Sequence, residues 1–178
     1  MIVCAGKIEQ FPFAKAIGIG LVESAINLSS LLLKAKNMPK EIIFVGTFGL
    51  YSKDGKIKIL DIIESCKALN LESSALLNLS YSPLLNLDNV SYETNLINCS
   101  NFITQNSEIS AKFAKLGLLG ENMELYSVLE VAKKFQIPAR GILCATNFCD
   151  ESAHKDFIKN HSQAKKLLEN YIKEREII

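Results

Sequence analysis

The chain has 178 residues, of which 48% are hydrophobic, and its formal net charge is +1. This length suits a single domain spanning residues 1–178, and the balanced charge predicts no nucleic-acid partner. No apolar run is long enough to cross a bilayer, and the first residues carry no basic leader with a long apolar core, so we expect neither a membrane partner nor secretion.

Five cysteines form no C-x-x-C pair, which disfavours a structural zinc site and a disulfide framework. Four of them lie in apolar stretches and are expected to be small core residues. This cysteine usage predicts a protein of a reducing compartment, most simply the cytoplasm, with no metal.

Strands alternate with helices along the chain. Apolar runs predict strands at residues 1–5, 14–20, 41–46, 56–65, 94–100 and 140–146. Helical spacing predicts helices at 21–36, 106–117, 117–135 and 152–175, whereas residues 66–92 give no clear assignment. The pattern predicts an α/β fold, a three-layer α/β/α sandwich with a mixed, largely parallel central sheet.

One glutamate interrupts the apolar pattern of the helix predicted at 117–135. Leu125, Val128 and Ala132 share one face of that helix, and Glu124 lies at its start beside this apolar stripe. A bare carboxylate is costly to desolvate there, so Glu124 is expected to hold a partner or ligand.

Ligands of open α/β folds gather at the carboxyl ends of the strands. Four of these ends carry the sequences GIGLVES, VGTFGLYS, NCSNFIT and CATNFCD. Together with ENMEL they supply small residues, hydroxyls, one aromatic ring, an amide and a carboxylate. This set suits a polar small molecule with a flat ring better than a metal or a peptide.

Taken singly, these residues leave alternatives open. Gly20 precedes a helix and either presents free N–H groups to an anion or a hydroxyl, or simply forms a tight turn. Thr47 either binds an anion or caps a turn, and Asn147 either recognises a purine edge or is a turn asparagine. His154 and His161 are interpreted as residues without a role in the site. Glu23 replaces the third glycine of a dinucleotide fingerprint, which excludes that site.

Taken in order, the stretches IGIGLVESAI, PKEIIFVGTFGLYS, CSNFIT and KLGLLGENMELYSVLEVAKKFQIPARGILCATN resemble the nucleoside phosphorylase superfamily. The resemblance implies that Glu124 binds the ribose hydroxyls, that Met123 packs against the sugar and that Phe102 stacks on the purine. It implies that Asn147 addresses the base during bond cleavage, and that Glu9 corresponds to the water-activating glutamate of the nucleosidases. Gly20 and Thr47 then belong to the sugar and phosphate region.

The chain also departs from the family pattern. Asn122 replaces the first glutamate of the family's E-M-E element, Phe44 stands where bacterial phosphorylases carry a phosphate-binding arginine, and Asn147 replaces the aspartate of the nucleosidases. The N-terminal side is expected to be shorter than in other members.

The leading hypothesis is phosphorolysis of a purine nucleoside, with phosphate as a possible co-substrate and no cofactor. The alternatives are a hydrolytic methylthioadenosine-type nucleosidase, favoured by the missing arginine and by Glu9, and a non-catalytic nucleoside-binding or protein-interaction member. We also expect a homodimer or a larger homo-oligomer that covers Phe11, Phe13 and the Leu-rich middle of the chain.

Overall fold

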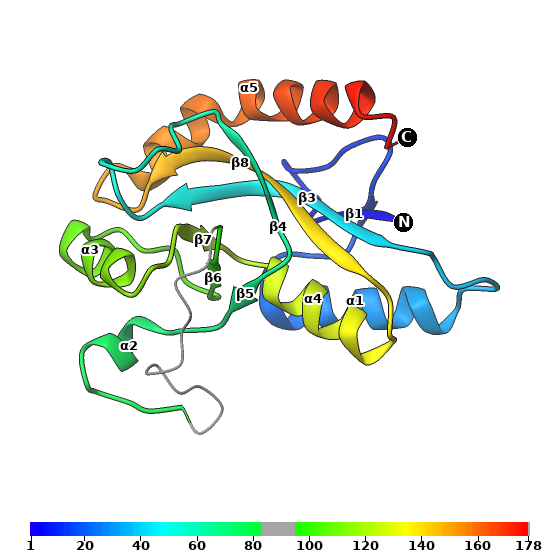
Figure 1. The fold of residues 1–178 in the computed structure, drawn as a ribbon, viewed down its shortest axis with the longest axis horizontal. Coiled ribbons are helices and arrows are strands. Elements are labelled where there is room, and N and C mark those ends of the chain that lie inside the picture. Colours follow the sequence, from blue (N-terminus) through cyan, green and yellow to red (C-terminus); the bar gives the residue numbers. More distant parts are fainter. Residues whose placement is uncertain (83–94, 178) are drawn as a thin grey trace.

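The computed structural model describes residues 1–82 and 95–177 of the chain (Figure 1). The strands are β1 (Ile2–Cys4), β2 (Lys15–Ala16), β3 (Ile42–Leu50), β4 (Ile62–Ser65), β5 (Ala68–Leu69), β6 (Ile97–Cys99), β7 (Gly120–Asn122) and β8 (Ala139–Phe148). The helices are α1 (Gly20–Leu33), α2 (Ser73–Leu76), α3 (Ser107–Lys115), α4 (Leu125–Lys134) and α5 (Ala153–Glu174).

The eight strands form one mixed sheet with β3 at its centre. Strand β3 pairs in parallel with β8 along its whole length and with β1 at its start, and it pairs antiparallel with β7 at its end. Strand β4 covers the outer edge of β8 in antiparallel orientation. Helix α5 lies on one face of the sheet, and α1 and α4 lie on the other (Figure 1). The predicted three-layer α/β/α sandwich is confirmed.

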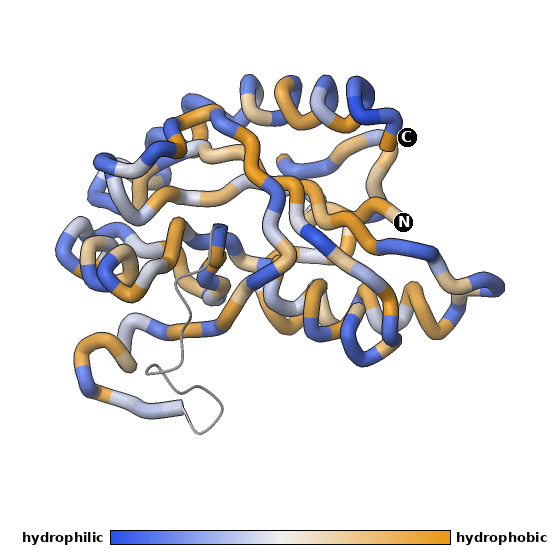
Figure 2. Tube along the Cα trace, viewed as in Figure 1, coloured by the Kyte–Doolittle hydropathy of each residue, from blue (hydrophilic) through white to orange (hydrophobic). Residues whose placement is uncertain are grey.

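The core fills the two spaces between the sheet and the helix layers. All nine residues of β3 are buried, as expected for a central strand covered on both faces. Leu168 and Ile172 of α5 are fully buried beneath one layer, and Leu28 and Val128 lie beneath the other. Hydrophobic and hydrophilic residues alternate along α5, as expected for a helix with one buried side (Figure 2).

The sequence predicted one helix over residues 117–135, and this prediction was wrong. Gly117, at φ +83°, follows α3, and β7 forms before α4 begins. Gly120 lies so close to β3 that an added Cβ would be 2.1 Å from the Gly49 carbonyl oxygen. Pairing with β3 therefore overrides the local helical pattern, and only glycine permits this close approach.

Three other boundaries differ from the prediction. The strand predicted at 14–20 is reduced to β2, and the one predicted at 56–65 is reduced to β4. Strand β3 continues past residue 46 to Leu50. The unassigned segment 66–92 contains β5 and α2, and its residues 83–92 lie outside the described part of the chain.

Phe11 was expected to need cover from another subunit, but it is only 2% exposed. It packs within the cluster beneath α5, so the prediction was wrong for this residue. The exposed apolar side chains include Val22, Ile26 and Leu33, all on α1. Four cysteines are buried, as the sequence indicated, and the fifth, Cys66, is exposed. Within residues 1–82 and 95–177, no helix combines the length and apolar character needed to cross a membrane.

Candidate active site

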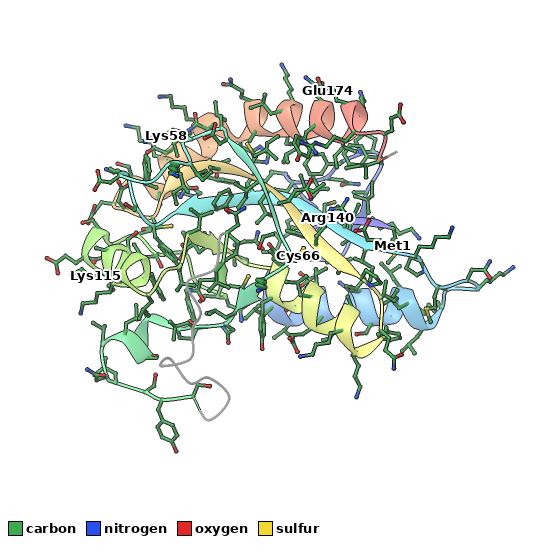
Figure 3. The ribbon with its side chains drawn as sticks, viewed as in Figure 1. Met1, Lys58, Cys66, Lys115, Arg140 and Glu174 are labelled. Carbon is green, nitrogen blue, oxygen red and sulfur yellow. The ribbon has the colours of Figure 1, made fainter. Side chains whose placement is uncertain are left out.

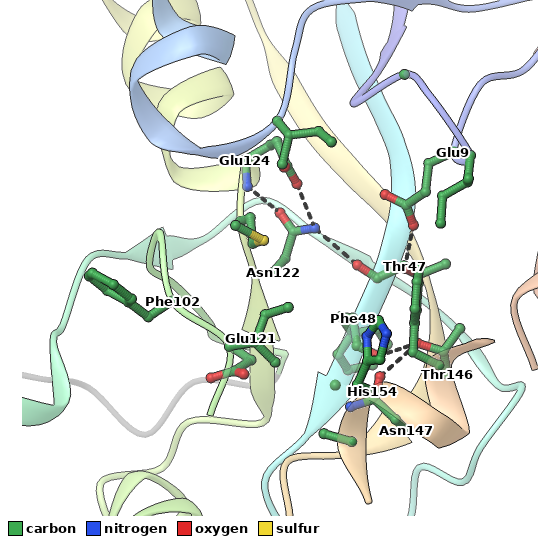
Figure 4. Close-up of a pocket in the computed structure, with 18 residues that line it drawn as sticks. Glu9, Thr47, Phe48, Phe102, Glu121, Asn122, Glu124, Thr146, Asn147 and His154 are labelled. Atoms are coloured by element: carbon green, nitrogen blue, oxygen red, sulfur yellow. Dashed lines mark hydrogen bonds between the residues drawn. The ribbon is translucent and has the colours of Figure 1, made fainter. Parts of the chain in front are cut away.

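A cavity of about 260 Å³ opens where β3 and β8 end (Figure 4). It lies between the β1–β2 loop, the loop after β6, the β7–α4 junction and the start of α5. Six of the seven predicted site residues line it: Glu9, Thr47, Phe102, Met123, Glu124 and Asn147. The seventh, Gly20, does not line the cavity but contacts Glu124 through its backbone.

Glu124 is 2% exposed and stands immediately before α4. Its Oε1 accepts the N–H of Gly20 at 2.9 Å, and its Oε2 accepts the side-chain amide of Asn122 at 3.2 Å. Burial raises the pKa of Glu124 to about 8, and the charge of Glu9 adds to that rise. The two carboxyl groups line the same cavity, which explains this effect of Glu9.

Three consecutive N–H groups at the start of α1 are already bonded to side chains, which disfavours one of the two readings of the sequence. The N–H of Ile19 is taken by Glu23 at 2.9 Å, that of Gly20 by Glu124, and that of Leu21 by the side chain of Asn101 at 2.8 Å. The other reading, a tight turn, describes Gly20, whose φ is +83°. An anion could reach these N–H groups only by displacing a side chain that already satisfies them.

Asn122, one of the departures from the family pattern, joins the two halves of the cavity. Its Oδ1 accepts the N–H groups of Glu124 and Leu125 at 2.8 and 2.7 Å, which caps α4. Its amide nitrogen donates to Glu124 and to the carbonyl oxygen of Thr47, the latter at 2.9 Å (Figure 4). A glutamate has no donor for these two acceptors, so the amide is required by this arrangement.

Glu9 and Thr47 form the second polar group of the cavity. The Thr47 hydroxyl donates a hydrogen bond to Glu9 Oε1. Burial raises the pKa of Glu9 above its ordinary value, and Thr47 and Lys165 oppose that rise. Lys165 itself donates to the carbonyl oxygen of Ile8 at 3.2 Å. The carboxyl group of Glu9 is therefore held in the cavity as a group of increased basicity.

Asn147 is 7% exposed and is the last buried residue of β8. Its Oδ1 accepts the Thr146 hydroxyl at 2.9 Å, and its amide nitrogen donates to the carbonyl oxygen of Phe148 at 3.0 Å. Both ends of the amide are thus engaged within the chain. A ligand that used this amide would have to exchange or share one of these bonds.

Phe102 lies on the side of the cavity away from Asn147 and is 76% exposed (Figure 4). The adjacent Ile103 also lines the cavity and is 51% exposed. The loop that carries them is tied to α1 through Asn101, as described above. A flat ring bound in the cavity could therefore stack on the exposed ring of Phe102.

Sequence reasoning also missed residues that line the cavity, among them Glu121, His154 and Phe157. Glu121 was hidden because β7 was taken as part of a helix, although a second glutamate close to Glu124 could have drawn attention to it. His154 was interpreted as a residue without a role, yet it lies in the first turn of α5, where β8 ends, with its ring 6.5 Å from that of Phe157. Its position directly after a strand end was the available signal.

Among the described residues that line the cavity, there is no lysine or arginine, but there are three glutamates. Arg140 lies at the opposite end of β8, where it pairs with Glu41 and Glu64 (Figure 3). The cavity is therefore acidic in character.

No protein-family model matches the chain, and no curated protein matches its sequence. Solved structures do match it. A mutant futalosine hydrolase of Helicobacter pylori has a TM-score of 0.76 and 18% identity, covering 97% of this chain and 95% of that one.

Two nucleosidase structures are also similar. One is an aspartate-to-asparagine mutant of the H. pylori methylthioadenosine/adenosylhomocysteine nucleosidase with 5′-methylthioadenosine in its active site (TM-score 0.74, 18% identity, 97% of both chains). The other is S-adenosylhomocysteine nucleosidase from Streptococcus pyogenes (TM-score 0.71, 14% identity, 95% of this chain and 92% of that one). At such identities the likeness establishes a shared fold.

Proposed function

We propose that this chain, which has the fold of the nucleoside phosphorylase superfamily, hydrolyses the N-glycosidic bond of a purine nucleoside. The observation that carries the proposal is the occupation of the expected phosphate region by carboxylates. The Gly20 N–H binds Glu124, and the Thr47 hydroxyl binds Glu9. Phosphorolysis, the leading hypothesis from the sequence, fits the solved neighbours less well than hydrolysis, because those neighbours are hydrolytic enzymes.

The charge of the cavity supports the same choice. A phosphate dianion near Thr47 would meet Glu9 and Glu124, with no lysine or arginine among the described lining residues to compensate. Phosphorylases need cations to hold this co-substrate, because burying a dianion without a compensating charge is costly whether or not the glutamates beside it are ionised. Water carries no charge and needs only an acceptor for one of its protons, which Glu9 supplies.

In this reaction Glu9 accepts a proton from water as the water oxygen bonds to C1′ of the sugar. The C1′–N9 bond breaks, and its electron pair leaves with the purine, which takes a proton from solvent. Glu124 accepts hydrogen bonds from the 2′ and 3′ hydroxyls, and Phe102 contacts the face of the base. The raised pKa of Glu9 brings its basicity closer to neutral pH, where a general base is most effective.

The experiment is a screen of nucleosides with the purified protein, with free base as the readout. Methylthioadenosine, adenosylhomocysteine, adenosine, inosine and guanosine are each incubated with and without phosphate. Hydrolysis predicts base release at the same rate in both buffers. Release that requires phosphate would restore phosphorolysis and contradict the proposal.

A second candidate function, nucleoside binding without cleavage, is favoured by Asn147. An amide cannot protonate a departing purine, and both ends of this one are already bonded to Thr146 and Phe148. Under this candidate, the same screen yields no free base, whereas calorimetry detects binding of at least one nucleoside, and Glu124→Gln weakens that binding.

A further inference from the structure

We propose that Glu121 is a positioning residue, which fixes the loop of residues 100–104 so that Phe102 lies against the base. The inference rests on the proposed function in one respect, namely that a purine lies on Phe102. Its structural part, the anchoring of the loop, stands apart from any activity. Neither the resemblance nor the sequence pattern assigned a role to Glu121.

The loop separates two cavities. Phe102 and Ile103 line the cavity of the candidate active site on one side. The same two residues, with Thr104, line a second cavity of about 160 Å³ on the other side, bounded by Glu72 and Asn98. Because both apolar side chains are more than half exposed, packing alone holds this loop weakly. There is space for it to move in either direction.

Hydrogen bonds therefore determine where the loop lies. On the side before Phe102, Asn101 accepts the N–H of Leu21 at 2.8 Å, and Ser100 accepts the N–H of Phe102 at 3.1 Å. On the side after it, Thr104 donates its N–H and its hydroxyl to Glu121, both at 2.7 Å. Glu121 thus supplies the anchor that ties this end of the loop to β7.

Glu121 is itself held rigidly. It is 8% exposed, and its Oε2 accepts the Tyr51 hydroxyl at 2.9 Å. Tyr51 in turn accepts the side-chain amide of Asn98 at 3.0 Å, and Asn98 lies opposite Glu121 in the pairing of β6 with β7. The orientation of the carboxylate is therefore set by the sheet and by Tyr51.

Counting acceptor sites separates this role from direct recognition of a ligand. A carboxylate accepts about four hydrogen bonds. Tyr51 and Thr104 supply three donors to Glu121. The thiol of Cys149 also lies close by: burial is the main cause that raises the pKa of Cys149, and the charge of Glu121 is the next. Glu124, by contrast, accepts hydrogen bonds from Gly20 and Asn122 and keeps acceptor sites for a ligand. Glu121 therefore anchors the loop, whereas Glu124 is available to bind a ligand in the cavity.

The test uses the absence of tryptophan from the chain. In a Phe102→Trp background, the single indole reports the motion of the loop through its fluorescence anisotropy decay. Glu121→Gln in that background is compared with Glu64→Gln. Glu64 makes a suitable control because it also accepts a tyrosine hydroxyl, that of Tyr171 at 2.9 Å, but does not line the cavity.

We expect Glu121→Gln to increase the amplitude of the fast anisotropy decay, and Glu64→Gln to leave it unchanged. In proteins that keep Phe102, titration with adenine and with hypoxanthine measures the affinity for the base. If the loop keeps its position about a tenth of the time, the apparent affinity falls about tenfold. An unchanged anisotropy decay in Glu121→Gln would overturn the proposal.

Thr104 provides a second pair of variants should Glu121→Gln fail to fold. Thr104→Ser keeps the hydroxyl donor and is expected to match the parent protein, whereas Thr104→Val removes it and should increase loop motion. Equal loop motion in these two variants would contradict the anchoring role. Failure of the proposed function is recognised separately, as the absence of base release from every nucleoside by a protein whose loop responds as expected.

Discussion

The substitution Glu124→Gln tests sugar recognition most sharply, because each oxygen of this carboxylate already accepts one bond from the protein. The bonds come from Gly20 at 2.9 Å and from Asn122 at 3.2 Å. About two acceptor sites remain, enough for the 2′ and 3′ hydroxyls of a ribose. In the glutamine variant one oxygen becomes an NH₂ group, which either faces the amide of Asn122 or gives up the Gly20 N–H.

The expected loss is about 1.5–3 kcal/mol in nucleoside binding, the range for a hydrogen bond to a charged group. This corresponds to a dissociation constant roughly 10- to 150-fold higher, measured by calorimetry with inosine or methylthioadenosine at a pH of about 9, where Glu124 is mostly ionised. The 2′,3′-dideoxynucleoside should bind both proteins alike. Glu23→Gln is the matched control, because Glu23 also accepts an N–H at the start of α1 but does not line the cavity. Equal losses for the ribo- and dideoxynucleosides would refute the assignment of Glu124 to the sugar.

Three further predictions concern pH, the base and assembly. Because the pKa of Glu124 is raised to about 8, the ionised carboxylate that accepts hydrogen bonds is lost as the pH falls, and nucleoside affinity should drop roughly tenfold from pH 9 to pH 7. An affinity that does not change with pH, in the parent protein and in Glu124→Gln alike, would contradict this. If the protein cleaves nucleosides, inosine or guanosine should be preferred over adenosine, and Asn147→Asp should shift the preference towards adenosine, because a carboxylic acid can protonate the base; faster cleavage of adenosine by the unmodified protein would oppose the argument. Val22 and Ile26 are four residues apart on one face of α1 and are 65% and 62% exposed, so we expect a homodimer through this face. Light scattering should show that Ile26→Asp dissociates it, and a monomeric parent protein at micromolar concentration would contradict the prediction.

Much of the cavity could be predicted because its residues follow strands or disturb a periodic pattern. Thr47, Phe102 and Asn147 were expected at a single sheet edge from their positions after apolar runs, and the structure brings them to one cavity. Glu124 was singled out because a buried carboxylate at the start of an apolar helix is costly without partners. Its partners, Gly20 and Asn122, then explain how the charge is accommodated.

What could not be predicted depends on contacts between distant parts of the chain. Strand β7 has three residues, and only its pairing with Gly49 and Asn98 distinguishes it from the first turn of a helix. A glycine before a helix indicates N–H groups that need acceptors, but not that Glu124, 104 residues away in sequence, supplies one of them. Phosphorolysis was the leading hypothesis from the sequence, in which these contacts cannot be seen. The sequence shows where hydrogen-bond donors for an anion could lie, whereas only the structure shows which acceptors already bind them.

The most direct test of hydrolysis is the fate of oxygen from the solvent. The protein is incubated with methylthioadenosine or inosine in ¹⁸O-labelled water containing unlabelled phosphate, and the sugar product is analysed at once by mass spectrometry. We predict one ¹⁸O atom in the free sugar, no sugar 1-phosphate, and loss of the labelled product in Glu9→Gln. Formation of an unlabelled sugar 1-phosphate would contradict the proposed function.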